Sequence, residues 1–360
     1  MSRSLNIVKF GGIAPRFGDK VPVGLATVAE NVDLAGNSLA LLPLSRRTIP
    51  TPLYSPTALS WPIGSLTVGL SLVGGVLKKT VGGITVDAGQ DAPAIPAVAL
   101  DGAGNITGDV AYVVTTTRNV GGHLDESGPS SPSTILSASS NKVAVTKPIG
   151  IDPYVTHWNI YRIGTAAEYL LVASVPIATG SYSDDIEEAD LGIAIPTFYT
   201  SRQDNSILFA KPGQMDGISS SVYHGMVFGF RGSTLFWNDP MLPDAWIPFY
   251  NMNWHSVIKR VIPFAGSVGV LTEAGPFKID GSNPELLNPS DVLGKEPCAG
   301  TAAYPWSKGI LYLSDSGIVN FNLMETEVIT DALFGEEWFS GNVDPATADI
   351  VENDGFIYLS

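Results

Sequence analysis

The carboxylates that lie close together in the sequence are the residues best suited to hold a metal ion. Asp184-Asp-Ile-Glu-Glu-Ala-Asp190 places five carboxylates within seven residues, and a hard cation such as Ca²⁺ needs several such oxygens. The spacing does not follow the EF-hand loop, so a solvated connection between strands is the competing interpretation. Asp101-Gly-Ala-Gly-Asn105 with Asp109 presents the same two alternatives. We expect no resident metal and no cofactor.

Motifs for nucleophilic, phosphate-binding or zinc-dependent catalysis are absent from the sequence. It contains no phosphate-binding loop ending in Gly-Lys-Ser/Thr, no His-Glu-x-x-His and no Gly-x-Ser-x-Gly. The four histidines are far apart, and His224, just before a predicted strand, is interpreted as structural. The single cysteine, Cys298, excludes an internal disulfide and is interpreted as an inert, half-buried thiol. The chain is therefore predicted not to be an enzyme.

Aromatic residues gather between Phe228 and Trp254. They could form a platform for sugars, but packing of one sheet against another is the stronger interpretation. The segment 238–248 carries three prolines and large apolar residues, which predicts a long ordered loop. Large apolar residues on a loop commonly dock onto another surface. We therefore predict a partner-docking loop with these contact residues: Pro240, Met241, Leu242, Pro243 and Trp246.

The scaffold behind these residues is a repeat. Copies begin at Gly225, Gly266 and Gly309, and a partial copy begins at Gly355, so the period is about 41 to 46 residues. Each copy consists of two short apolar runs joined by a Gly-containing turn, the pattern of a β-hairpin. A period in the low forties with one hairpin in each unit is typical of β-propeller blades, which stack to bury a common core. A weaker copy lies at 63–80.

An insertion separates the weak first copy from the copy at Gly225. Short runs of alternating apolar residues recur in it about 10 to 20 residues apart, a spacing typical of a β-sandwich. We therefore predict an all-β chain with a β-propeller-like body, which this chain need not complete, and an inserted sandwich. Residues 1–100 would hold an N-terminal arm and the first propeller strands, 101–200 the sandwich, and 201–360 the propeller blades.

The charge balance limits the partners. With 35 acidic and 20 basic residues the net charge is −15, which disfavours a surface that grips nucleic acid through its phosphates. Only 15% of the residues are charged, which is mild support for a chain with much surface covered by neighbours. The N-terminus lacks the apolar core of a secretory signal, and no run reaches the ~18 apolar residues of a membrane span. We expect no signal-dependent secretion and no membrane anchor.

Short motifs in the chain resemble structural proteins of tailed bacteriophages. The order of motifs in the insertion is similar to that of fibronectin type III-like domains in phage virion proteins: Tyr112-Val-Val, Glu126-Ser-Gly-Pro-Ser, Trp158-Asn-Ile-Tyr-Arg, Tyr182-Ser-Asp and Leu191-Gly. Motifs outside it resemble the tail tube or nozzle proteins of short-tailed phages, the tail tubular protein B-like family: 10–16, 29–34, 224–230, 236–240 and 245–246.

This resemblance implies a propeller-based subunit of a virion. It implies a homo-oligomeric ring of identical subunits below the head-to-tail adaptor, on the side of the portal, with tail fibres or spikes as further partners. Such a protein is made in the host cytoplasm and resides in the phage tail. One departure is that the repeat stops within a blade at Ser360. N-terminal strands, a continuation of the chain or a neighbouring subunit would have to complete the ring of blades.

Three functions remain to be compared. The favoured one is a structural subunit of a phage tail nozzle that conducts DNA during ejection, because an acidic wall lets phosphates pass without tight binding. The alternative is a tail-fibre or adhesin-type module that binds carbohydrate or a receptor, which the aromatic cluster favours. A glycan-hydrolysing propeller would need two carboxylates flanking a cleft. Glu273, Asp280 and Asp315 lie near blade turns and are interpreted as turn formers instead.

Overall fold

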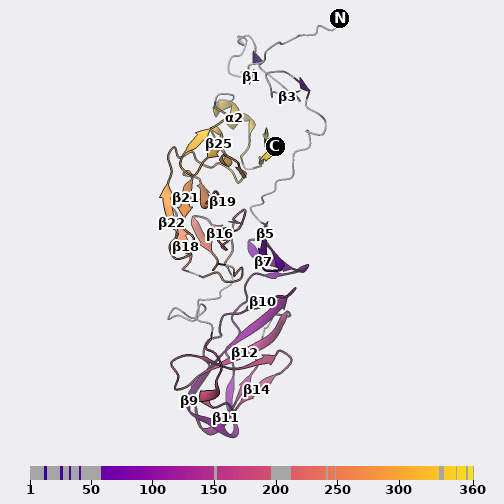
Figure 1. Cartoon of the computed structure of the whole chain (residues 1–360), viewed down its shortest axis with the longest axis vertical. Coiled ribbons are helices and arrows are strands. Elements are labelled where there is room, and N and C mark those ends of the chain that lie inside the picture. The colour runs from indigo at the N-terminus through magenta and orange to yellow at the C-terminus, as the bar shows by residue number, and fades with distance from the viewer. Residues whose placement is uncertain are drawn as a thin grey trace. The chain divides into compact units, whose positions relative to one another are not determined.

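The computed structural model describes residues 12–13, 25–26, 32–33, 40–41, 58–149, 152–195, 212–240, 242–247, 249–331, 336–345, 347–353 and 356–359. The chain divides into two compact units, Thr57–Asn253 and Met1–Pro56 with Trp254–Ser360. Most described residues lie in short antiparallel strands, so the predicted all-β class is confirmed (Figure 1). The short N-terminal strands form two pairs, β1 with β2 and β3 with β4: Gly12–Ile13, Leu25–Ala26, Val32–Asp33 and Ala40–Leu41.

The first sheet of the Thr57–Asn253 unit is a four-stranded antiparallel meander. Gly74–Gly75 and Gly82–Gly83 make two of its turns, with φ values of 59° and 80° and of 57° and 81°. Positive φ at both central residues is the signature of the type I′ turn, whose twist matches the flanking strands. Every second residue of its third strand is buried, so Lys79 faces the interior together with apolar neighbours. The strands are β5 Ala58–Ile63, β6 Leu66–Val73, β7 Val76–Val81 and β8 Ile84–Asp87.

The inserted region forms two antiparallel sheets that share one long strand, β9, at Val98–Val120. The first half of β9 pairs with β11, which also pairs with β14. The second half pairs with β12 and with the short β10, and β12 pairs with β13. Apolar side chains from both sheets, among them Tyr112, Val143 and Trp158, meet in one core. The remaining strands are β10 His123–Glu126, β11 Leu136–Thr146, β12 Val155–Ile163, β13 Leu170–Pro176 and β14 Ser181–Asp184.

The edge of β9 beyond β10 is covered by residues 127–133, which do not form a strand. Ser127, Ser130 and Ser133 each donate a backbone N–H to a carbonyl of β9, at 2.8 to 2.9 Å. Their hydroxyls accept the N–H groups of the same β9 residues, at 2.9 to 3.0 Å. Serine at every third position therefore supplies the acceptors that a pairing strand would offer, and the buried edge of β9 has its hydrogen bonds.

A second four-stranded sheet of this unit shares a core with the β5–β8 sheet. Trp61, Val68 and Leu70 of the first sheet belong to one cluster with Ile218 and Val227. Each sheet buries the apolar face that it could not bury alone, which is how neighbouring blades stabilise one another. Its strands run in the order β15 Gly217–Ile218, β16 Phe228–Arg231, β17 Thr234–Trp237 and β18 Asn251–Asn253.

The other unit contains two more four-stranded meanders. They share a core to which Ile262 and Leu271 contribute from one sheet and Ile310, Tyr312 and Phe321 from the other. The first consists of β19 Ile258–Phe264, β20 Ser267–Thr272, β21 Phe277–Asp280 and β22 Asn288–Asp291. The second consists of β23 Ala303–Trp306, β24 Gly309–Ser314, β25 Gly317–Phe321 and β26 Thr326–Val328. They are followed by α2 Glu336–Asn342, β27 Ile350–Asn353 and β28 Phe356–Leu359.

The predicted hairpins are confirmed: the copies that begin at Gly225, Gly266 and Gly309 contain β16–β17, β20–β21 and β24–β25. Each sheet has two strands more than the hairpin, which gives the four-stranded antiparallel form of propeller blades. The partial copy at Gly355 corresponds to β28, which pairs with β27. Closure of a propeller, the fibronectin likeness and the domain boundaries stay predictions. The predicted arm and proline-rich linker lie almost wholly outside the described residues.

Candidate functional site

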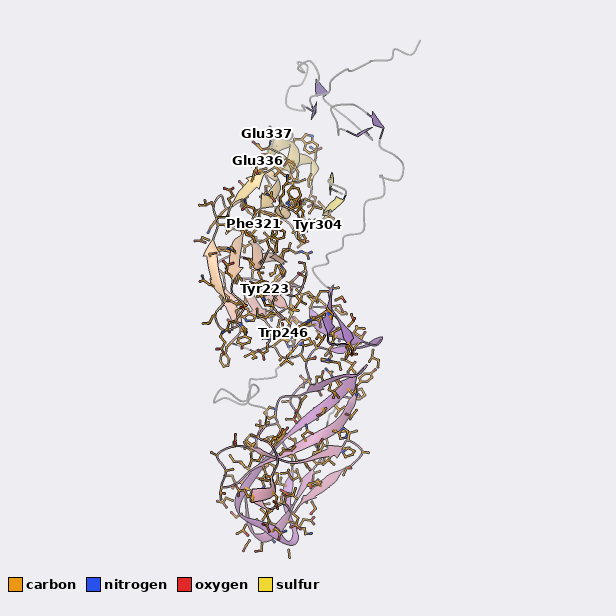
Figure 2. The ribbon with its side chains drawn as sticks, viewed as in Figure 1. Tyr223, Trp246, Tyr304, Phe321, Glu336 and Glu337 are labelled. Carbon is orange, nitrogen blue, oxygen red and sulfur yellow. The ribbon has the colours of Figure 1, made fainter. Side chains whose placement is uncertain are left out.

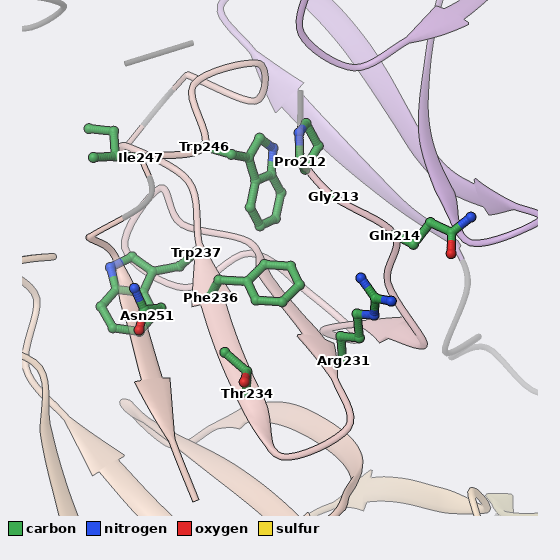
Figure 3. A pocket seen from close by; sticks show the side chains of 10 residues that line it. All are labelled: Pro212, Gly213, Gln214, Arg231, Thr234, Phe236, Trp237, Trp246, Ile247 and Asn251. Carbon is green, nitrogen blue, oxygen red and sulfur yellow. The ribbon is translucent and has the colours of Figure 1, made fainter. Parts of the chain in front are cut away.

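The aromatic region encloses a pocket of about 350 Å³ within the Thr57–Asn253 unit. Figure 3 shows its lining, which comes from the segment before β15, from the β16–β17 hairpin and from the loop that leads to β18. The volume lies at the low end of the range of about 300 to 1,000 Å³ for small-ligand sites. Its lining residues are Pro212, Gly213, Gln214, Arg231, Thr234, Phe236, Trp237, Trp246, Ile247 and Asn251.

The base of the pocket is apolar and held rigidly. Trp246 is 5% exposed, and its ring meets that of Phe236 edge to face with the centroids 6.1 Å apart. Trp237 stacks on Tyr250 with centroids 6.0 Å apart and an interplanar angle of 10°. Both arrangements are favoured by the quadrupoles of aromatic rings. The base therefore offers an apolar surface of fixed shape.

The loop that carries Trp246 is held by its own polar contacts. Asn238 accepts the N–H of Val227 at 2.6 Å and donates its Nδ2 to the carbonyl of Leu242 at 3.0 Å. The indole Nε1 of Trp246 donates to the carbonyl of Pro243 at 2.9 Å. These bonds satisfy polar groups that would otherwise be buried unpaired. The loop thus presents Trp246 to the core of its own unit.

The rim of the pocket carries a positive charge. Arg231 is the last residue of β16 and is exposed, whereas the three residues before it are buried. Among the lysines and arginines that the structure describes, Arg231 is the one whose side chain has no hydrogen bond, ion pair or ring contact to another described residue. Gln214 and Asn251 add exposed amides to the rim. The site is therefore an apolar base with an uncompensated cation beside it.

Asp244, on the same loop, connects three parts of the unit through a buried ionic network. Its carboxylate lies 2.7 Å from the Nζ of Lys79 on β7 and 3.1 Å from the Nε2 of His123 on β10. It also accepts the N–H of Gly89 at 2.7 Å. Burial raises the pKa of Asp244, but the hydrogen bond from His123 and the charge of Lys79 outweigh burial and hold that pKa well below its usual range.

Asp125 completes this network from the side of the sandwich. It pairs with Lys79 and, at 2.7 Å, with Arg118 of β9. Arg118 is further held by Asp152 at 3.1 Å, and its Nη2 donates to the carbonyl of Asp87 at 3.0 Å. The network ties β7, the sandwich and the pocket loop together. None of its members lines the pocket, so we interpret it as structural support.

The four described residues of the predicted docking set do not share one exposed surface. Pro243 and Trp246 are buried, and Pro240 and Leu242 are half-buried. Met241 lies outside the described residues. Trp246 docks onto the core of its own unit, where it lies in one cluster with Trp61 and Val68. That the loop contacts a partner stays a prediction.

The acidic run at 184–190 does not gather around a common point. Asp184 lies 2.6 Å from the Nη1 of Arg162 and accepts the hydroxyl of Tyr112 at 2.8 Å. Burial and the charge of Asp184 raise the pKa of Tyr112 above its usual value. Asp185 and Glu188 each accept a backbone N–H elsewhere in the sandwich. Asp184 is fully buried, so the interpretation as a solvated connection is wrong for that residue, whereas residues 185–190 are half-buried or exposed as it expects.

Other residues considered for chemistry also have structural surroundings. Among the residues that the structure describes, no three His, Cys, Asp or Glu side chains come together as a metal site. His224 is exposed and forms a tight turn with Gly225, with φ values of 47° and 78°. Cys298 is fully buried rather than half-buried, and burial raises the pKa of its thiol to about 12. No helix within the described ranges is long and apolar enough to cross a membrane.

Sequence reasoning missed Arg231, Lys79 and Asp244. Lys79 had a readable signal, because it occupies an inward-facing position in the alternating strand 76–81. A lysine there must have a buried counter-charge. Arg231 follows an apolar run directly before the hairpin turn, which places it at the end of a strand. No local signal indicates that Asp244 is the carboxylate that reaches Lys79, 165 residues away.

No protein-family model and no curated protein matches this chain. Among solved structures, it is similar to the crystal structure of BBS1N in complex with ARL6DN, soaked with lead, at 10% identity over 76% of this chain and 82% of that chain, with a TM-score of 0.25. The same complex soaked with mercury matches at 10% identity over 74% of this chain and 90% of that chain, with a TM-score of 0.21. Likeness at this level carries no conclusion, and the blade-like sheets are identified here from their strand order alone.

Proposed function

We propose that this chain is a structural subunit of a ring-shaped bacteriophage tail nozzle, through which DNA leaves the virion. Its copies would form a homo-oligomeric ring that joins the head-to-tail adaptor to the distal tail, with fibres or spikes as further partners. The protein would be made in the host cytoplasm and reside in the phage tail. The proposal assigns it no catalytic step and no cofactor. The motif resemblance of 10–16 and 224–240 suggests it.

The observation that carries the proposal is the disposition of charge. Burial removes four cations but two carboxylates from the surface of the described residues: Lys79, Arg118, Arg162 and Arg260 against Asp184 and Asp244. The exposed side chains of the described residues therefore carry a more negative summed charge than all described side chains together. Most described surface lysines are paired with carboxylates: Lys78, Lys142, Lys259, Lys278 and Lys295. Such a surface offers few sites for phosphate, as a conduit for DNA requires.

The blade-like sheets supply the second support. Four-stranded meanders bury their apolar faces against neighbouring meanders, as the clusters around Val68 and around Ile310 do. A body built in this way can present different patches on its two sides. Identical copies joined through two such patches form a ring when the rotation closes.

Electron microscopy of the purified full chain tests the proposal. We expect rings with a central channel, and a monomer at high concentration would contradict it. A companion measurement is the affinity for double-stranded DNA in a filter or fluorescence assay. Because the surface is acidic, we expect no saturable binding even at about 20 mM salt, where phosphate contacts are strongest. Tight, salt-sensitive DNA binding would contradict a conduit with a repelling wall.

The second candidate function is carbohydrate binding, as in a tail fibre or adhesin. The observation that favours it is the pocket itself, with an apolar aromatic base and amides at its rim. Arrayed glycans and calorimetry on the full chain test it. Specific binding of a glycan by a protein that does not self-associate would select this function over the nozzle.

A further inference from the structure

Two features in different parts of the chain complement each other in shape and charge. One is the aromatic pocket beside Arg231, whose guanidinium has no partner among the described residues. The other is the outer side of α2, where an exposed tryptophan follows two exposed glutamates. A cation next to an apolar hollow fits an aromatic side chain that is accompanied by carboxylates.

The outer side of α2 is built to present these residues. Phe339 is 1% exposed and anchors the helix in a core that includes Leu311 of β24 and Ile318 of β25. Trp338, next to it, therefore points away from that core and is 38% exposed. The side chains of Glu336 and Glu337 (Figure 2) are exposed, and within the described ranges neither carboxylate has a partner.

The indole of Trp338 is 38% exposed, so part of its apolar surface can be covered by a partner. Aromatic side chains bury about 150 to 250 Å² when fully covered, and they are enriched in the cores of interfaces. The carboxylates of Glu336 and Glu337 beside it add a negative charge that a cation of another copy can complement. In a chain of net charge −15, unpaired cations are scarce. Arg231 is the described cation whose side chain has neither a polar partner nor a ring contact, and it lies at a hollow that can receive an aromatic ring.

We propose that the aromatic pocket of one copy receives Trp338 from a second copy of this chain, while Arg231 pairs with Glu336 or Glu337 of that copy. The inference rests on the proposed ring and names its subunit contact. The two surfaces differ, so the contact is heterologous and repeats from copy to copy, as a ring requires. Tryptophan and arginine are the residues most enriched at the energetic centres of interfaces.

The choice of a second copy over a sugar rests on charge and on the base of the pocket. Trp237 is covered by Tyr250, and Trp246 is almost fully buried, so neither indole presents a broad open face to a sugar ring. A neutral glycan would also leave Arg231 unpaired. The segment 336–338 supplies both the aromatic ring and the carboxylates that this site lacks.

The test is a charge exchange in the full chain, followed by sedimentation velocity and mass photometry. We expect Trp338→Ala and Arg231→Glu each to weaken self-association by at least about 30-fold, as loss of a central interface residue does. The double variant Glu336→Arg with Glu337→Arg should dissociate the assembly in the same way. Combining it with Arg231→Glu restores opposite charges and should restore assembly.

Matched controls separate this contact from general loss of surface residues. Leu293→Ala removes another exposed apolar side chain, and Lys308→Glu reverses another exposed charge. Both should assemble like the natural chain, and circular dichroism should show that all variants are folded.

Each alternative outcome overturns the proposed contact. If the natural chain forms rings that Arg231→Glu and Trp338→Ala leave intact, the contact is wrong and the nozzle function stands. If the natural chain stays monomeric at about 100 μM, both fail, since stable interfaces assemble well below that concentration. Arg231→Glu and the double variant Glu336→Arg with Glu337→Arg should each lose assembly. If combining them does not restore assembly, the pairing is also contradicted. A pocket that binds a glycan in competition with assembly would identify a sugar as its occupant instead.

Discussion

Replacing Lys79 by methionine tests whether the buried ionic network stabilises the Thr57–Asn253 unit. Lys79 is 0% exposed, and its Nζ contacts both Asp125 and Asp244. Methionine keeps the apolar stem and removes the charge. Asp125 would keep Arg118 at 2.7 Å, whereas Asp244 would keep His123, the N–H of Gly89 and a longer contact of 3.8 Å with Arg118. The decrease in the free energy of unfolding is therefore dominated by Asp244, a buried carboxylate that has lost its nearest cation.

Removing one partner from a buried ion pair costs about 3 to 5 kcal/mol. Because Asp244 retains two hydrogen bonds, we expect about 3 kcal/mol for Lys79→Met, which lowers the midpoint of urea unfolding by about 1 to 2 M. The neighbouring Lys78 is the matched control. It pairs with Asp87 on the other face of β7, and its side chain is 29% exposed. Lys78→Met should therefore cost less than about 1 kcal/mol.

The assay is equilibrium unfolding in urea, followed by tryptophan fluorescence and by hydrogen exchange of β7 and β10. A double variant, Lys79→Met with Asp244→Asn, removes the stranded charge, so it should be more stable than the sum of the two single losses predicts. Equal losses for Lys79→Met and Lys78→Met would refute the reasoning. Strict additivity in the double variant would show that Lys79 and Asp244 do not interact.

Three further predictions concern other described contacts. Ser130→Ala removes the hydroxyl that accepts the N–H of Val114, so it should destabilise the sandwich by about 1 to 2 kcal/mol and speed exchange of that amide, whereas an unchanged exchange rate would exclude the serine contact. Because the pKa of Asp244 is lowered in the fold, the unfolded state binds more protons than the folded state below about pH 4, and the free energy of unfolding should fall as pH drops from there. Asp244→Asn should reduce this dependence of the free energy of unfolding on pH. The same pH dependence in the variant and in the natural chain would contradict the network. Burial raises the pKa of Cys298 to about 12, so its thiol should react with a disulfide reagent at pH 8 only after unfolding, and rapid labelling of the native chain would contradict its burial.

The hairpins could be predicted because their signal is local. Gly225, Gly266 and Gly309 start apolar runs whose periodicity a strand imposes directly on the sequence. The fourth strand of the β19–β22 sheet could not be predicted in the same way, unlike β8, which the apolar run after Gly82–Gly83 indicates. β22 reads Asn-Pro-Ser-Asp, and its residues are exposed or half-exposed. A strand whose residues stay exposed needs no apolar face, so its hydrogen bonds to β21 define it.

The candidate site was predictable in its composition but not in its geometry. The aromatic region 228–254 could be recognised as packing between sheets, and the proline-rich loop as one with apolar anchors. The direction in which Trp246 points depends on Asn238, whose side chain bridges Val227 and Leu242. Because of that direction, Trp246, which was predicted to dock onto a partner, packs into the core of its own unit. Contacts of this kind join distant parts of the chain and leave no periodic signal.

The acidic run shows that the spacing of carboxylates in the sequence does not predict whether they come together in the fold. Five carboxylates in 184–190 suggest one shared site. In the fold, Asp184 at the end of β14 is buried against Arg162, while Asp185 accepts an N–H of β9 and Glu188 accepts the N–H of Ala166. Asp184 is the last residue of β14, whereas the other four carboxylates lie beyond the strand in an irregular segment and a 3-10 turn, so proximity in sequence does not bring the five together.

The measurement that tests the central claim most directly is cryo-electron microscopy of the full chain, purified without other virion proteins. The proposal predicts closed rings in which four-stranded blades surround a channel lined by carboxylates. A population of single subunits without a channel, at concentrations where virion rings assemble, would contradict it.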